Sequence, residues 1–120
     1  MNRKILVIED NEQNLYLVTF ILEKNGFDVI QARSGDEGVK LAGQSKPDLI
    51  LLDIQLPVMD GYTVARELRK MPSLASIPIV AVTSFAMPGD RENALAAGCT
   101  GYIEKPIDPD TFMSQISQHL

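Results

Sequence analysis

Short and almost unbroken runs of apolar residues recur along the chain, and this pattern restricts its fold more than any other feature of the sequence. Five such runs are present: Lys4–Ile8, Phe27–Gln31, Asp48–Asp53, Ile77–Thr83 and Gly101–Glu104. Continuous rather than alternating apolar runs are typical of strands that are buried on both faces, as in a parallel sheet. We therefore predict one strand from each run.

Helix-length segments with recognisable ends lie between these runs. They are Asn11 to Asn25 before Gly26, Ser34 to Pro47, Asp60 to Pro72, a segment from Pro88 to Gly98, and a last one after Asp108-Pro109. Their first turns carry the capping residues and prolines that begin helices. Alternating strands and helices imply right-handed crossovers. The expected fold class is α/β: a five-stranded parallel sheet with five helices in a doubly wound (βα)5, flavodoxin-like arrangement.

Size and composition exclude several classes of protein. The chain has 120 residues, within the usual single-domain range of roughly 100 to 150, so we expect one domain, 1–120. A net charge of −5 without a basic stripe argues against a nucleic-acid partner. No apolar run approaches the roughly 20 residues that span a bilayer, and no signal-peptide pattern begins the chain. Cys99 is alone, so no disulfide is expected. We expect a cytoplasmic protein without membrane contact.

Acidic residues end two of the predicted strands. Glu9 and Asp10 follow the first apolar run, and Asp53 ends the third. In doubly wound sheets the functional site lies at the carboxyl ends of the strands, so these carboxylates are expected to meet. A cluster that repels itself usually holds a divalent cation or a proton. Asp10, Asp53 and one backbone carbonyl would suffice for Mg²⁺.

Two further strand ends carry groups that suit phosphoryl chemistry. Thr83 ends the fourth predicted strand and Lys105 follows the fifth. With both as donors, Asp53 could attack a phosphoryl donor, because a metal and cationic groups offset the negative charge that accumulates. Taken singly, Asp10 is equally well explained as a helix cap, Thr83 as a β-branched strand residue and Lys105 as a solvated lysine. Their combination favours a site.

The strand-end residues, taken in their order along the chain, resemble the motifs of the receiver domain of two-component response regulators. The motif set is Glu9-Asp10, then Asp53 with Pro57 and Gly61, then Thr83, then Lys105-Pro106, and the resemblance covers essentially all of the chain. The residues around Asp53 and after Thr83 look most like stand-alone receivers of the DivK type, with receivers of hybrid kinases close behind.

The resemblance implies a role for each matching residue. Asp53 would accept a phosphoryl group from a histidine kinase or a histidine phosphotransfer protein. Asp10 would bind Mg²⁺ directly, Glu9 mostly through water, and Gln55 through its carbonyl. Lys105 and Thr83 would contact the phosphoryl oxygens.

The resemblance also implies a switch. Pro106 would follow a cis peptide bond, and Tyr102 occupies the position of the family's switch aromatic. A dianionic group on Asp53 would draw Thr83 inward, and the vacated space would admit the Tyr102 ring. The signal would reach a protein target through the fourth helix, fifth strand and fifth helix. The alternative for Tyr102 is an ordinary half-exposed aromatic on an edge strand.

The expected function is a signalling module that catalyses only its own phosphorylation and dephosphorylation. One alternative is a phosphohydrolase of the haloacid dehalogenase type, but Gln55 stands where that family carries a second acid. A flavodoxin-like cofactor binder is disfavoured because Glu9-Asp10 would repel a phosphate. A receiver-like module that is never phosphorylated is a further alternative. Gln55 and Phe85 occupy two family positions that tune dephosphorylation, and the bulk of Phe85 predicts slow self-hydrolysis.

Overall fold

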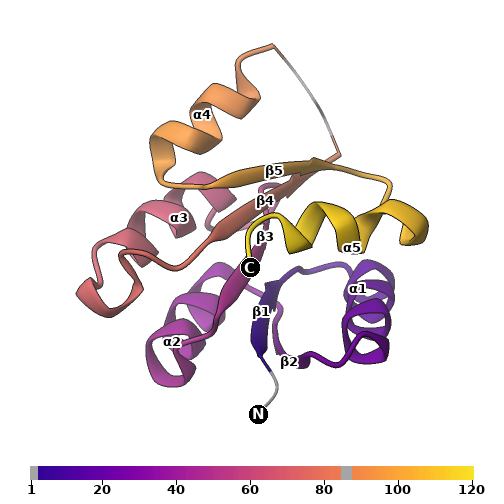
Figure 1. The fold of residues 1–120 in the computed structure, drawn as a ribbon. Coiled ribbons are helices and arrows are strands. Elements are labelled where there is room, and N and C mark those ends of the chain that lie inside the picture. Colours follow the sequence, from indigo (N-terminus) through magenta and orange to yellow (C-terminus); the bar gives the residue numbers. More distant parts are fainter. Residues whose placement is uncertain (1–2, 85–87) are drawn as a thin grey trace.

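The computed structural model describes residues 3–84 and 88–120, which form one parallel sheet with helices on both faces (Figure 1). The strands are β1 (Lys4–Ile8), β2 (Asp28–Ala32), β3 (Leu49–Asp53), β4 (Ile79–Thr83) and β5 (Gly101–Glu104). They lie in the order β2-β1-β3-β4-β5, and every neighbouring pair is parallel. The predicted fold class is confirmed.

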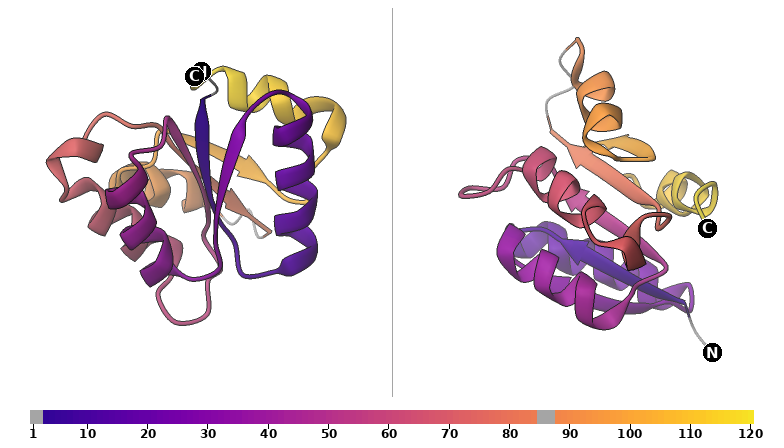
Figure 2. Two further views of the ribbon diagram at one scale, coloured as in Figure 1. Left: turned by 90° about the horizontal axis from the view of Figure 1, so that it is seen from below. Right: turned by 90° about the vertical axis from the view of Figure 1, so that its left-hand side faces the viewer.

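The helices form two layers around this sheet. They are α1 (Glu12–Lys24), α2 (Gly35–Ser45), α3 (Gly61–Arg69), α4 (Asp90–Ala97) and α5 (Pro109–Ser117), with a short 3-10 turn at Pro72–Leu74. Helices α1 and α5 cover one face, and α2, α3 and α4 cover the other (Figures 1 and 2). Because all five strands are parallel, their carboxyl ends lie at one edge of the sheet.

Side-chain caps begin the helices where the sequence places polar residues. The Ser34 hydroxyl accepts a hydrogen bond from the Glu37 backbone N–H at 3.1 Å, as a capping box requires. The Glu37 carboxylate reaches back to the N–H of Arg33 at 2.7 Å rather than to that of Ser34. Asp60 caps α3 through the Thr63 N–H at 3.0 Å.

Several element boundaries differ from the sequence prediction. Strand β4 begins at Ile79 rather than Ile77, directly after Pro78, which has no N–H to donate to a ladder. Helix α4 begins at Asp90 and not at Pro88, because Gly89 adopts φ 91°, outside the helical region. The 3-10 turn was not predicted, since Pro72 alone indicates only the end of α3.

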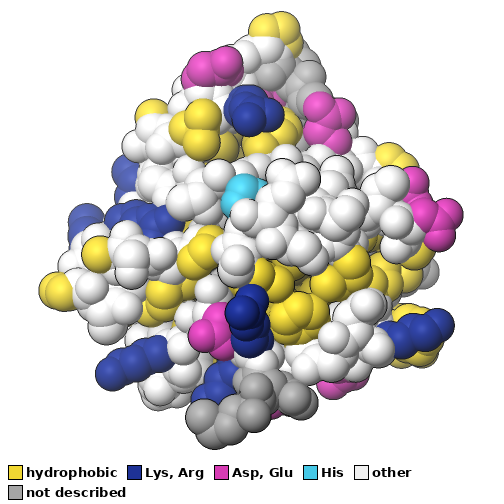
Figure 3. Space-filling view, viewed as in Figure 1, with side chains coloured by type: hydrophobic (Ala, Val, Ile, Leu, Met, Phe, Trp, Pro, Cys, Tyr) yellow, Lys and Arg dark blue, Asp and Glu magenta, His cyan; other side chains and the backbone are white. Residues whose placement is uncertain are grey.

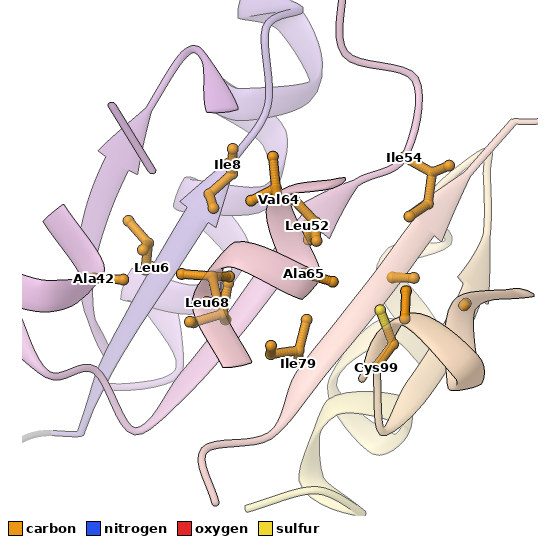
Figure 4. Packing of buried hydrophobic residues seen from close by; sticks show 14 of the residues in the cluster. Leu6, Ile8, Ala42, Leu52, Ile54, Val64, Ala65, Leu68, Ile79 and Cys99 are labelled. Carbon is orange, nitrogen blue, oxygen red and sulfur yellow. The ribbon is translucent and has the colours of Figure 1, made fainter. Parts of the chain in front are cut away.

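The core is split by the sheet into two apolar layers. Alternation along β1 sends Leu6 and Ile8 to the face covered by α2 and α3, and sends Ile5 and Val7 to the face covered by α1 and α5. Figure 4 shows the first layer, with Leu6 and Ile8 near the helical Leu68 and Val64. Glu9, directly after β1, and Asp53, the last residue of β3, continue this alternation, so both acids lie above the α1–α5 layer.

The surface is mixed in charge. Lys and Arg side chains lie as separate groups on the face shown in Figure 3, with hydrophobic side chains between them near its centre.

In the part of the chain that the structure describes, none of the helices has the length and apolar character needed to cross a membrane.

Candidate functional site

The acidic residues at the strand ends lie together. Strands β1 and β3 are neighbours, with Ile8 opposite Leu52, so the next residues, Glu9 and Asp53, are brought side by side. One carboxylate oxygen from each of Glu9, Asp10 and Asp53 lies within 4.8 Å of the other two. Glu9 and Asp53 are 5% and 4% exposed, whereas Asp10 is exposed. The structure therefore brings together the three acids that the sequence placed at one sheet edge.

Lys105 is the cation of this cluster. Its ammonium nitrogen lies 2.9 Å from Glu9 Oε1 and 3.5 Å from Asp53 Oδ2, and its side chain is only 12% exposed. The Lys105 N–H donates to the Thr83 carbonyl at 2.7 Å, which extends the β4–β5 pairing to the site. The Lys105–Pro106 peptide bond is cis, so that prediction is confirmed.

The surroundings of Glu9 favour its neutral form. A small cavity beneath the cluster is lined mainly by apolar side chains, among them Val7, Leu51 and Phe112. The pKa of Glu9 is raised to about 7: burial is the largest cause, the contact with the Asp53 carboxyl adds to the rise, and Lys105 opposes it. One lysine thus faces more acidic groups than it can neutralise.

The loop after β3 closes tightly against Asp53. The Gln55 N–H donates to Asp53 Oδ1 at 3.0 Å and so fixes the orientation of the carboxylate. The Gly61 N–H donates to the Ile54 carbonyl at 3.0 Å. A Cβ atom on Gly61 would lie 2.7 Å from the Asp53 carbonyl oxygen and 2.6 Å from the Ile54 Cα, so only glycine allows this approach.

Thr83 ends β4 beside this loop and is 2% exposed. Its hydroxyl oxygen accepts a hydrogen bond from Gln55 Nε2 at 2.6 Å, and the Ser84 N–H donates to Gln55 Oε1 at 3.0 Å. The sequence predicted for Gln55 a metal-binding carbonyl and a position that tunes dephosphorylation, but it did not predict the side-chain contacts with Thr83 and Ser84. No sequence signal could have found this contact, because it joins loops 28 residues apart. Phe85 lies outside the described residues, so the prediction of slow self-hydrolysis stays a prediction.

Tyr102 lies on β5 opposite Ala81, on the face of the sheet covered by α3 and α4. The ring packs partly buried against that apolar layer, and its buried hydroxyl has no well-aligned hydrogen bond among the described residues. Desolvation, followed by the charges of Asp90 and Glu104, raises the pKa of Tyr102, while the nearby Thr83 hydroxyl opposes the rise. The ring therefore occupies an inward position near Thr83.

The donor set fits a hard divalent cation. Mg²⁺ prefers oxygen ligands and is commonly held by one or two carboxylates together with water. The described residues offer three clustered carboxylates, and that of Asp10 is exposed to solvent.

A parallel sheet of this order, with clustered acids and a lysine at its carboxyl edge, defines a receiver of two-component signalling. The response regulator receiver domain family matches residues 5–117, and the chain belongs to this family. Receivers interact with histidine kinases or phosphotransfer proteins and with downstream targets, and they bind Mg²⁺ in their acidic pocket.

Individual relatives agree with this membership. The chain is 42% identical to the polar-differentiation response regulator DivK of Brucella ovis, over 100% of this chain and 98% of that protein. It matches the chemotaxis protein CheY4 of Vibrio cholerae with a TM-score of 0.96 at 27% identity, over 100% of both chains. It also matches the receiver domain of the sensor histidine kinase PA1611 of Pseudomonas aeruginosa PAO1, with a TM-score of 0.91 and 34% identity over 99% and 98% of the two chains. That structure contains a magnesium ion coordinated in the active-site cleft.

Proposed function

We propose that this receiver is a phosphoacceptor that takes a phosphoryl group onto Asp53 from a histidine kinase or a histidine phosphotransfer protein. The observation that carries the proposal is the position of Asp53, whose carboxylate is 4% exposed and lies 3.5 Å from the Lys105 ammonium, beside two further acids. A carboxylate oxygen of Asp53 forms a bond to phosphorus while the bond from phosphorus to the donor's nitrogen or oxygen breaks. Lys105 offsets the charge of the transferred group.

Mg²⁺ is the proposed cofactor. Asp10, Asp53 and the Gln55 carbonyl would hold it directly and Glu9 mostly through water; when bound, the ion supplies positive charge to the reacting oxygens. The chain's own residues do the positioning: the Gln55 N–H orients the Asp53 carboxylate, and Thr83 offers a hydroxyl beside it.

The proposed output is a change of a protein-binding surface formed by α4, β5 and α5. A dianionic group on Asp53 is a new acceptor for the Thr83 hydroxyl, and Tyr102, which lies on the same face of the sheet, would respond to the displacement of Thr83. The cis peptide before Pro106 belongs to the same region. We further propose that residues 1–120 act as one domain in the cytoplasm.

A self-modifying signalling module is favoured over a phosphohydrolase of the haloacid dehalogenase type. Such an enzyme needs a second acid two positions after the nucleophile as its proton donor. The residue there is Gln55, whose amide is not an acid and is engaged with Thr83 and Ser84. The protein is therefore proposed to catalyse only its own phosphorylation and dephosphorylation.

Intact-mass spectrometry after incubation with acetyl phosphate tests the proposal. The wild-type protein should gain one phosphoryl group in the presence of Mg²⁺ and none with EDTA. Asp53→Asn should gain none, whereas Asp36→Asn, at a position in the first turn of α2, should match the wild type. Because rapid hydrolysis could hide an adduct, beryllofluoride binding is measured alongside. Absence of both the adduct and beryllofluoride binding would contradict the proposed function.

A further inference from the structure

One neutral side chain joins the two loops beside Asp53. Gln55 follows β3, yet its Nε2 donates to the Thr83 hydroxyl at 2.6 Å and its Oε1 accepts from the Ser84 N–H at 3.0 Å. Since the Ser84 backbone N–H can only donate, the amide oxygen must face it, and this fixes the orientation of the amide group. The Gln55 amide therefore bridges the loop after β3 and the end of β4.

The two groups that Gln55 engages are suited to an anion on Asp53. Strands β3 and β4 are paired with Asp53 opposite Val82, so the end of β4 lies next to the Asp53 backbone. The Gln55 N–H is itself bound to Asp53 Oδ1 at 3.0 Å. The Asp53 carboxylate, the Gln55 amide and the Thr83–Ser84 segment thus surround one small region. A phosphoryl oxygen is a stronger acceptor than an amide oxygen, because hydrogen bonds to ionised groups are roughly twice as strong.

We propose that the Gln55 side chain is a placeholder that occupies Thr83 and Ser84 in the resting receiver and is displaced by the phosphoryl group. Gln55 is a positioning residue in this arrangement, and the inference rests on the proposed phosphorylation of Asp53. The side chain is exposed, so the displaced amide can move into water and form new hydrogen bonds there. The resting contacts oppose the phosphorylated conformation, and their removal favours it.

Beryllofluoride, which mimics an aspartyl phosphate, measures this effect at equilibrium. Gln55→Met keeps the length of the side chain and the backbone carbonyl but removes both hydrogen bonds. Gln44→Met is the matched control at an exposed position on α2. In calorimetric titrations with Mg²⁺, we expect Gln55→Met to bind roughly threefold to tenfold more tightly than wild type, the range that a net hydrogen-bond contribution implies. Gln44→Met should bind like the wild type. If Gln55→Met binds beryllofluoride no more tightly than the wild type, the proposal that Gln55 is a placeholder is overturned.

The backbone amide of Ser84 supplies a readout that a general loss of stability would not move. In ¹H–¹⁵N spectra without beryllofluoride, the Ser84 resonance of Gln55→Met should lie displaced from its wild-type position, toward the position seen in the beryllofluoride-bound wild type. In the wild type, the Gln55 side-chain NH₂ resonances should move on saturation. An unchanged Ser84 resonance in Gln55→Met overturns the inference. If the wild type shows neither the acetyl phosphate adduct nor beryllofluoride binding, the proposed function fails and this inference fails with it. If the wild type binds beryllofluoride but Gln55→Met does not differ from it, only this inference fails.

Discussion

The ammonium group of Lys105 lies closer to Glu9 than to Asp53, at 2.9 Å from Glu9 Oε1 against 3.5 Å from Asp53 Oδ2. In the resting molecule, the ion pair of Lys105 with Glu9 is therefore shorter than its ion pair with Asp53. A new anionic group on Asp53 would compete with Glu9 for this ammonium. The protonation state of Glu9 then affects how firmly the lysine is held, because a neutral carboxyl attracts it less.

Glu9 makes the stability of the metal-free protein depend on pH. The pKa of Glu9 is raised from 4.5 to about 7, mainly by burial, so the folded state binds more protons than the unfolded chain between these values. Stability from this group is fully present below pH 4.5 and is lost as the pH rises toward 7. In EDTA, the free energy of unfolding should fall across this window by up to about 3 kcal/mol.

Urea unfolding at several pH values checks this expectation. Glu9→Gln has a neutral amide of the same shape, so it should lose this component of the pH dependence. Glu23→Gln, at an exposed position on α1, should keep the wild-type slope. Parallel pH curves for wild type and Glu9→Gln would contradict the prediction.

Tyr102 should report activation. The ring lies on the same face as Thr83, and its hydroxyl is buried in the resting protein. When Mg²⁺ and beryllofluoride saturate the site, displacement of Thr83 should change the ring environment and shift its aromatic ¹H–¹³C resonances. The ring of Tyr16, which is 72% exposed on α1, should be unaffected. A Tyr102 spectrum that stays unchanged at saturation would show that this ring is not part of the switch.

Two glycines in α2 should respond in opposite directions to alanine substitution. A Cβ at Gly38 would lie 2.4 Å from the Ile8 Cδ1 atom in the core, whereas at Gly43 the nearest atom is the flexible Met71 Sδ at 3.4 Å. Gly43→Ala should stabilise the protein by about 0.5–1 kcal/mol through helix propensity. Gly38→Ala should destabilise it by about 1–3 kcal/mol through overpacking. Urea midpoints measure both, and stabilisation by Gly38→Ala would show that the helix moves away from β1 at little cost.

Arg69 should be important for stability, unlike its neighbour Lys70. The Arg69 guanidinium donates to the carbonyls of Leu74 at 2.8 Å, Ile77 at 2.7 Å and Gly98 at 2.9 Å. Arg69→Met would leave these carbonyls without this donor, and it should cost about 2–4 kcal/mol in thermal or urea unfolding.

Lys70→Met is the control for this prediction. It removes an exposed ion pair with Glu67 at 3.0 Å and should change stability by less than about 0.5 kcal/mol. Similar losses for the two variants would mean that the carbonyl contacts of Arg69 contribute little.

The sequence predicted the elements well because their signals are local. Apolar runs such as Leu49–Asp53 are strands because a parallel sheet buries both of their faces. Boundaries were less accurate where a single residue decides them. Helix α4 begins at Asp90 because Gly89 before it has a positive φ. Strand β4 begins at Ile79, directly after Pro78, which cannot donate a backbone hydrogen bond. Neither shift follows from apolar periodicity.

The sequence by itself determined the class of fold and the identity of the acids at its carboxyl edge, since chain order and apolar pattern decide which residues end each strand. Only the tertiary structure decided which groups touch. The preference of Lys105 for Glu9, the bridge from Gln55 to Thr83 and the raised pKa of Glu9 all depend on strand register and loop closure. These contacts join residues far apart in the chain, and differences of a few tenths of an ångström, which no sequence pattern encodes, select between them.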